Sequence, residues 1–177
     1  VLGRHPAQRV GLERELAAAI ERDGRDELAG AVLDVHRVGL VGQREAERLA
    51  RLLGELDGDP ALAVGILTGA GGTFCSGMDL KAFLQGEIPE VEGRGFAGIT
   101  HRPPDKPVIA AVEGYALAGG CEIALACDLI AAAKGAKFGL PEAKRSLVAG
   151  AGGLFRLPQR IPRTIAMEYA LTGEFFS

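Results

Sequence analysis

The stretch that decides the fold is KPVIAAVEGYALAGGCEIALACDLIAAA, residues 106–133. Its apolar composition predicts a buried strand over 107–114 and a second strand over 128–133. Between them, AGGCEIALACD at 118–128 predicts a helix that is apolar on nearly all sides. A helix of that kind is expected to lie inside the protein, with the strands packed around it.

The start of the predicted helix combines two unfavourable residue types. Gly119 and Gly120 stand directly before Cys121 and Glu122. Glycine is a poor helix former, and a carboxylate is costly to bury. We infer that the protein needs bare backbone and a charge together at this point.

A second unit with the same plan precedes this stretch. LAVGILT at 62–68 predicts a short buried strand, and the glycine-rich segment GAGGTFCSGMD at 69–79 follows it. A phosphate-binding loop would need a GK[ST] ending or a third glycine, and Phe74 occupies the place of that glycine. Phe74 also excludes the GxSxG nucleophile elbow. The loop therefore gives only weak support for nucleotide binding.

Hydrophobic periodicity and turn signals predict the remaining elements. They are helices over 12–22, 43–57 and 164–173, one or two strands within 29–41, a turn and then a helix over 137–147, and a helical stretch opened by GAGG at 150–153. Gly173 ends the last of these helices. For the Gly-, Pro- and Glu-containing segment 84–105 we expect at most a short helix within a flexible region.

Composition narrows the class of protein. A chain of 177 residues with 47% apolar and 24% charged residues suits one globular domain. The formal net charge of −3 gives no basic surface for nucleic acid or for an anionic membrane. The first residues contain no apolar signal core, and no apolar run reaches the ~18–20 residues that span a bilayer. We expect no membrane partner and no nucleic-acid partner.

The three cysteines and three histidines do not suggest a metal site. Cys75, Cys121 and Cys127 lie in apolar stretches without CxxC spacing, and the histidines are scattered. We expect reduced, buried thiols and a cytoplasmic location. We interpret Cys75 and Cys121 as packing residues and His101 as a loop residue.

The two glycine-rich loops, at 69–79 and at Gly119 and Gly120, could bind a negatively charged oxygen. The first turn of a helix has free N–H groups and an electropositive dipole end. Two such N–H groups that converge on one oxygen would form an oxyanion hole, and Gly119 suits this role because it has no side chain. Glu122 lies three residues further on, so its carboxylate falls on the same helix face.

The acidic residues have structural alternatives that spacing alone leaves open. Glu122 and Glu142 each lie in the first turn of a predicted helix, where a carboxylate satisfies the dipole or the backbone. Asp79 is placed to cap a helix that runs through residues 80 and 81. Asp128, at the end of the buried helix, is expected to be a hydrogen-bonded structural acid.

Three motifs together resemble the enoyl-CoA hydratase (crotonase) superfamily. They are GGTFCSGMDLK at 71–81, the whole of 106–133, and FGLPEAK at 138–144. The resemblance covers residues 55–177, which we expect to form a crotonase-like acyl-CoA-binding core. It implies an α/β fold, a crotonase-like spiral of repeated ββα units that is incomplete at both ends. It also implies an acyl-CoA thioester substrate, a homotrimer or a dimer of trimers, and no metal or other cofactor.

The resemblance also implies roles for individual residues. The backbone amides of Met78 and Gly119 would form the oxyanion hole, Glu122 would activate water, and Glu142 would deliver a proton. The implied reaction is hydration of a 2-trans-enoyl-CoA to a 3-hydroxyacyl-CoA. The positions that match the substrate-binding part of the motifs are Ser76, Asp79, Leu80, Leu117 and Pro141.

The chain departs from the superfamily pattern at both ends. Residues 1–54 form an atypical N-terminal segment without the expected Asn-Arg-Pro-like turn, and our hypothesis is a replaced N-terminus from a shifted reading frame. The chain stops at LTGEFFS, where relatives continue, so we expect exposed apolar surface. Met78 stands where a small residue is common, and its side chain is expected to narrow the pocket. Two alternatives stay open: another acyl-CoA reaction (isomerase, hydrolase or lyase), and a non-catalytic fragment or pseudoenzyme.

Overall fold

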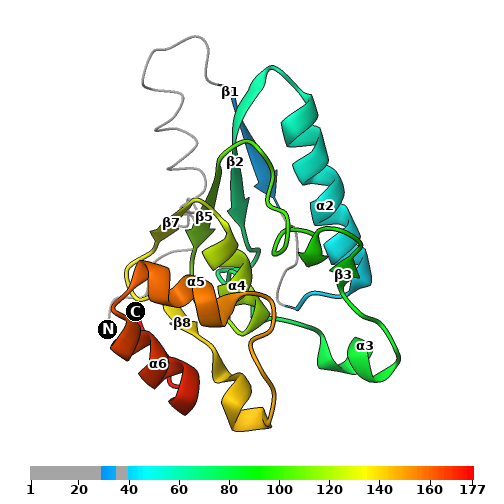
Figure 1. The fold of residues 1–177 in the computed structure, drawn as a ribbon. Coiled ribbons are helices and arrows are strands. Elements are labelled where there is room, and N and C mark those ends of the chain that lie inside the picture. The colour runs from blue at the N-terminus through cyan, green and yellow to red at the C-terminus, as the bar shows by residue number, and fades with distance from the viewer. Residues whose placement is uncertain (1–28, 35–39) are drawn as a thin grey trace.

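The structure is a computed structural model that describes residues 29–34 and 40–177 (Figure 1). The helix predicted over 12–22 lies outside these residues, as does most of the atypical N-terminal segment. The division of the chain at residue 54 stays a prediction. The helix predicted over 43–57 is present as α2 (Gln43–Gly58), which runs continuously across that division.

The centre of the fold is a four-stranded parallel sheet in the order β1 (Ala29–Asp34), β2 (Leu62–Thr68), β5 (Val108–Val112) and β7 (Leu129–Ala132). Each of these strands was predicted from its apolar run. All three ladders are parallel, as buried sheets of this kind usually are. The α/β class predicted from the resemblance is therefore confirmed.

Helices cover the sheet and complete the core. In α2 the four buried residues are Ala46, Leu49, Leu53 and Leu56, which lie on the face that the periodicity predicts. Helix α4 (Gly119–Ala126) is buried at every position, in agreement with its uniformly apolar sequence. Figure 1 shows α5 (Gly153–Arg160) and α6 (Arg163–Thr172) beyond α4, towards the C-terminus.

Two short sheets were not predicted. Strands β3 (Glu90–Val91) and β4 (Gly95–Phe96) pair antiparallel, and β6 (Tyr115–Leu117) pairs parallel with β8 (Lys137–Gly139). The expectation of a flexible segment over 84–105 was wrong for its second half, because residues 95–100 are all buried. For 137–147 the expected turn was wrong, because residues 137–139 form β8, while the expected helix is present as the short 3-10 helix η2 (Pro141–Arg145).

Several local predictions are confirmed. Asp79 caps α3 (Leu80–Leu84), because its Oδ1 accepts hydrogen bonds from the amides of Lys81 at 2.8 Å and Ala82 at 3.3 Å. Gly173 ends α6 in the left-handed conformation, with φ of 65°. Asp128 is a structural acid whose Oδ2 accepts a 2.8 Å hydrogen bond from the Val108 amide.

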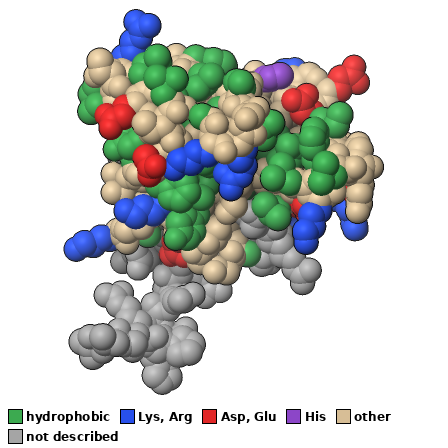
Figure 2. All heavy atoms as spheres, turned by 90° about the horizontal axis from the view of Figure 1, so that it is seen from below, with side chains coloured by type: hydrophobic (Ala, Val, Ile, Leu, Met, Phe, Trp, Pro, Cys, Tyr) green, Lys and Arg blue, Asp and Glu red, His purple; other side chains and the backbone are tan. Residues whose placement is uncertain are grey.

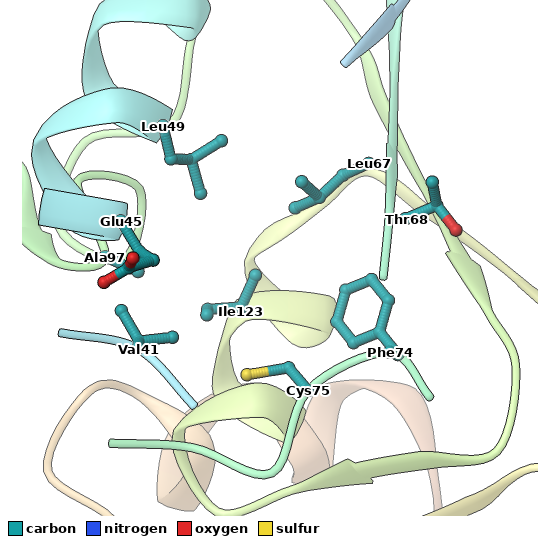
Figure 3. A pocket seen from close by; sticks show the side chains of 9 residues that line it. All are labelled: Val41, Glu45, Leu49, Leu67, Thr68, Phe74, Cys75, Ala97 and Ile123. Carbon is teal, nitrogen blue, oxygen red and sulfur yellow. The ribbon is translucent and has the colours of Figure 1, made fainter. Parts of the chain in front are cut away.

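The three cysteines are free and buried. Figure 3 shows Cys75 at a small void in the core, where it faces side chains from α2, β2 and α4, among them Leu49, Leu67 and Ile123. The void measures about 20 Å³, which is room for about one water molecule. Cys75 is therefore a buried packing residue, as the sequence predicts.

No helix in residues 29–34 and 40–177 is long and apolar enough to cross a bilayer. Within the same residues, no group of three or more His, Cys, Asp and Glu side chains is arranged to hold a metal ion.

Candidate active site

The sheet topology brings the two glycine loops together. Strands β2 and β5 are parallel neighbours, with Thr68 opposite Ala111, so the segments that follow them leave from the same edge. The segments then pair directly: the Cys75 amide donates to the Tyr115 carbonyl and the Leu117 amide donates to the Cys75 carbonyl, both at 2.9 Å. The two strand–loop–helix units that look alike in the sequence therefore lie side by side in the structure.

Glycine is required at the contact between the loops. A Cβ on Gly120 would collide with the carbonyl oxygen of Cys75. Gly77 has a φ of +98°, and a Cβ there would lie 3.1 Å from the Gly119 nitrogen. Gly120 is thus explained by close approach of the Cys75 backbone, whereas a Cβ on Gly119 would meet the ring of Phe96.

The directions of two amides follow from their peptide planes. The Gly77 carbonyl accepts a 2.8 Å hydrogen bond from the Val41 amide. Because the C=O and N–H of a trans peptide point in opposite directions, the Met78 N–H points away from Val41. The Ala118 carbonyl accepts from the Glu122 amide at 3.1 Å, so the Gly119 N–H points out of the first turn of α4.

Neither of these amides has a hydrogen-bond partner within the part of the chain that the structure describes. Met78 and Gly119 therefore offer two unused donors from two adjacent loops. One of them belongs to the positive end of a helix dipole, which favours negative charge. Such donors suit an anionic oxygen.

Glu122 is a buried carboxylate held by backbone amides of the turn before α5, at Gly153 and Ala151. Its side chain is 4% exposed, and its Oε1 accepts a 2.9 Å hydrogen bond from the Gly153 amide at the start of α5. Burial raises the pKa of Glu122 to about 7, the Gly153 amide opposes this shift, and the nearby Glu142 carboxylate adds to it. Glu122 is therefore poised to exchange a proton near neutral pH.

Glu142 lies at the start of η2 and faces the same region. Burial raises its pKa, while its own backbone amide and Arg145 act in the opposite direction. Its Oε2 is buried and has no hydrogen-bond partner among the described residues. A buried acceptor without a partner is costly, so this oxygen is suited to a ligand or a protonated state.

A cavity of about 320 Å³ has the Glu142 side chain in its wall. Glu142 and Gly153 line it, and the other lining residues of η2, α5, α6 and the segment between η2 and α5 are apolar or nearly so. Gly153 links the cavity to Glu122, because a Cβ on Gly153 would lie 3.1 Å from Glu122 Cγ. The site thus joins an apolar cavity to two carboxylates.

The other residues predicted to bind substrate lie in three places. Ser76, Asp79 and Leu80 surround Met78 in the first loop, where Ser76 and Leu80 are exposed and Asp79 caps α3. Leu117 is half-buried at the end of β6, two residues before Gly119. Pro141 is buried and begins η2, directly before Glu142.

Three residues of the site escaped the sequence reasoning. Gly153 holds Glu122, and the GAGG run at 150–153 could have signalled it, because a helix start offers free amides. Phe96 lies against Gly119, and Arg156 influences the Glu122 carboxylate. No local pattern marks Phe96 or Arg156 as part of a site.

Two carboxyl groups of raised pKa beside an apolar cavity, in an α/β fold with free helix-start amides, define a candidate acid–base enzyme site. The family comparison agrees with this class. The model of the enoyl-CoA hydratase/isomerase family matches residues 43–177. The chain belongs to the enoyl-CoA hydratase/isomerase family, and its fold is that of the crotonase superfamily.

Curated relatives carry a more specific name. The chain is 42% identical over 146 residues to the carnitinyl-CoA dehydratase of Proteus mirabilis, a match that covers 80% of this chain and 56% of that protein. It is 53% identical over 119 residues to the carnitinyl-CoA dehydratase of Shigella flexneri, covering 65% of this chain and 46% of that protein. The chain thus spans about half the length of these relatives.

Solved structures agree in fold. The enoyl-CoA hydratase EchA1 from Mycobacterium marinum superposes with a TM-score of 0.79 at 58% identity, covering 86% of this chain and 61% of that one. A carnitinyl-CoA hydratase from Mycobacterium avium superposes with a TM-score of 0.77 at 44% identity, covering 86% and 60%.

Proposed function

We propose that this chain carries the active site of an enzyme that hydrates 2-trans-enoyl-CoA to 3-hydroxyacyl-CoA. The observation that carries the proposal is the proximity of two carboxyl groups with raised pKa: Glu142 lines the apolar cavity, and Glu122 binds the amide of Gly153 in the cavity wall. The family membership supports an acyl-CoA thioester as the substrate. The names of the relatives support the same chemistry, because dehydration is the reverse of hydration.

The thioester carbonyl oxygen would lie between the amides of Met78 and Gly119. When the oxygen of water bonds to C3, negative charge develops on the thioester oxygen as an enolate. Two N–H donors aimed at that oxygen bind the transition state more strongly than the substrate. The proposal is supported by the adjacency of the two loops and by the absence of partners for these amides among the described residues.

The two glutamates would divide the proton transfers. Glu122, ionised, takes a proton from the attacking water, and Glu142, protonated, delivers a proton to C2. One water is consumed: its oxygen and one hydrogen form the hydroxyl at C3, and a proton adds at C2. Gly153 binds Oε1 of Glu122, and Oε2 would face the water. Two carboxylates in one pocket favour one neutral and one charged form.

The cavity beside Glu142 would receive the acyl group. Its apolar lining suits a hydrocarbon chain. The exposed loop residues Ser76 and Leu80, with Asp79, Leu117 and Pro141, would contact the rest of the acyl-CoA. The chemistry needs no metal and no cofactor besides the coenzyme A of the substrate itself.

Self-association and a cytoplasmic location complete the proposal. Large apolar side chains are exposed along α6 and the segment before α5, among them Val148 at 73% and Leu171 at 71%. Figure 2 shows apolar areas with basic side chains between them on one face of the molecule. We propose that a homotrimer, or a dimer of trimers, covers part of this surface.

Hydration of a 2-enoyl-CoA, followed as loss of the enone absorbance, tests the reaction. We expect Glu122→Gln and Glu142→Gln each to reduce kcat by about 10²- to 10⁴-fold. Full activity in both variants would exclude the two-glutamate mechanism. Circular dichroism of both variants controls for folding.

A panel of thioesters separates the alternatives. Product analysis with 2-enoyl-, 3-enoyl- and carnitinyl-CoA distinguishes a hydratase from an isomerase, a hydrolase or another lyase. A chain that binds no acyl-CoA and elutes without a defined oligomer in size-exclusion chromatography would favour a non-catalytic fragment or pseudoenzyme.

A further inference from the structure

Arg156 of α5 connects two segments, one of which holds Glu122. Its Nη2 donates a 2.6 Å hydrogen bond to the Thr100 carbonyl, and its Nη1 donates a 3.2 Å hydrogen bond to the Ala151 carbonyl. Thr100 is buried, at the end of the segment that follows β4. The planar guanidinium thus joins that segment to the turn that precedes α5.

The turn tied down by Arg156 is the one that holds Glu122. Ala151 lies two residues before Gly153, whose amide donates to Glu122 Oε1 at 2.9 Å. Gly152, between them, has a φ of +113°, and a Cβ there would collide with Arg156 Nη1. The guanidinium is therefore packed directly against the backbone of the turn.

We propose that Arg156 is a positioning residue for Glu122: by binding the carbonyls of Thr100 and Ala151 it fixes the turn whose Gly153 amide holds the Glu122 carboxylate. The importance of this for catalysis rests on the proposed function, but the contact itself does not. Loss of the guanidinium would free the Ala151–Gly153 turn and loosen the hydrogen bond from the Gly153 amide to Glu122 Oε1, together with the contribution of the Ala151 amide.

The charge of Arg156 also favours the ionised Glu122 carboxylate, which its hydrogen bonds help to hold in place. Three groups from the elements around Glu122 interact with it electrostatically: Glu142 from η2, Arg156 from α5, and the thiol of Cys121 on its own helix. Burial raises the pKa of Cys121 to about 12, so that thiol is neutral at neutral pH. Arg156 is then the cation that favours the ionised form of Glu122, against burial and Glu142.

Titration of Glu122 in the full chain tests the proposal without any substrate. The ¹³Cδ resonances of labelled glutamate can be followed from pH 4 to 9, with Glu122 and Glu142 assigned through their Gln variants. We expect Arg156→Gln to move the Glu122 midpoint to higher pH. An unchanged midpoint would overturn the proposal.

Arg160 provides a matched control on the same helix. Its guanidinium also binds two carbonyls, those of Asp128 at 3.0 Å and Cys127 at 2.7 Å, but it does not act on Glu122. We expect Arg160→Gln to lower stability while the Glu122 midpoint stays at its wild-type value. An equal shift in both variants would show a general structural effect and overturn the proposal.

A second variant covers the case in which Arg156→Gln does not fold. Arg156→Lys keeps the charge and loses the two-pronged contact, so we expect faster hydrogen exchange at the Gly153 amide than in wild type. Wild-type protection of Gly153 in Arg156→Lys would overturn the proposal. Where the wild-type chain hydrates enoyl-CoA, we expect the Lys variant to lose about 10- to 100-fold in kcat with little change in KM.

Discussion

Gly119 lies with its Cα against the ring of Phe96, so that a Cβ at this position would be 2.5 Å from ring Cε1 and 2.6 Å from Cζ. The contact joins β4 to the first residue of α4. It gives Gly119 a packing role in addition to the close approach of its amide to Gly77. The Gly119 amide is thus held in place from two sides.

Gly119→Ala is expected to destabilise the protein. The new methyl group overpacks against Phe96, which typically costs about 1–3 kcal/mol. Chemical denaturation measures the change in the free energy of unfolding, and Phe96→Leu in the same chain should recover part of it. Gly54→Ala in α2 is the control: its Cβ meets nothing within 4 Å, and we expect a gain of roughly 0.5–1 kcal/mol. Equal effects of the two substitutions would contradict the prediction.

Glu122→Gln should stabilise the protein at high pH. In the folded state burial raises the pKa of Glu122 from 4.5 to about 7. The contribution of Glu122 to stability is therefore greatest below pH 4.5, where the carboxyl is protonated in both states, and it is lost as pH rises through about 7. The difference amounts to about 3 kcal/mol. Urea unfolding at pH 5 and pH 8 should show the advantage of the Gln variant growing with pH.

The exposed Glu168 of α6 provides the control for this titration effect. Glu168→Gln should change the free energy of unfolding by the same small amount at both pH values. A Glu122→Gln variant that behaves in the same way would mean that Glu122 is not buried as described.

Hydration should depend on pH through the two carboxyl groups. The proposed base must be ionised, so kcat/KM should rise as pH increases through about 7, the pKa of Glu122. The proposed acid must be protonated, so ionisation of Glu142, whose pKa burial also raises, should lower kcat/KM. Because the two carboxyl groups interact, the apparent pKa values of the rise and of the fall belong to Glu122 and Glu142 together. A flat profile between pH 5 and pH 8 would contradict these roles.

The thiols should be unreactive in the folded chain. Burial raises the pKa of Cys75, Cys121 and Cys127 to about 12 in each case. Thiolate is the reactive form, so iodoacetamide at pH 8 should leave all three unmodified. Mass spectrometry after treatment in denaturant should then show three additions. Modification of a native cysteine would show that the core around it opens.

The parts of the fold that the sequence predicted well are those whose signal is strong over many residues. The strand at 62–68, the strand at 107–114 and the helix at 118–128 are mostly apolar, and the folded chain buries much of β2 and β5 and all of α4. The short strands β6 and β8 span three residues each, which is too few for a period of two to appear. Their pairing is decided by neighbours far away in the chain.

The residues of the candidate site could be predicted only in part, because some of their contacts join segments that are distant in the sequence. The loop amides of Met78 and Gly119 were proposed from motifs that lie next to the strands that position them. Glu122 and Glu142 come together because β8, which precedes η2, pairs with β6 beside α4, and no local spacing records that pairing. The hold of Gly153 on Glu122 likewise depends on how α5 packs against α4.

The parallel main sheet has a consequence for how the chain finds its structure. Its ladders join residues as distant as Gly30 with Val64 and Gly65 with Val108, and none is closed by a hairpin. The strands can pair only after the long segments between them have closed into loops, which makes folding intrinsically slow. Until then the backbone N–H and C=O groups at the strand edges lack their hydrogen-bond partners. In stopped-flow refolding the sheet should assemble on the slow side of the range for small domains, and intermediates caught during synthesis should be clients for chaperones.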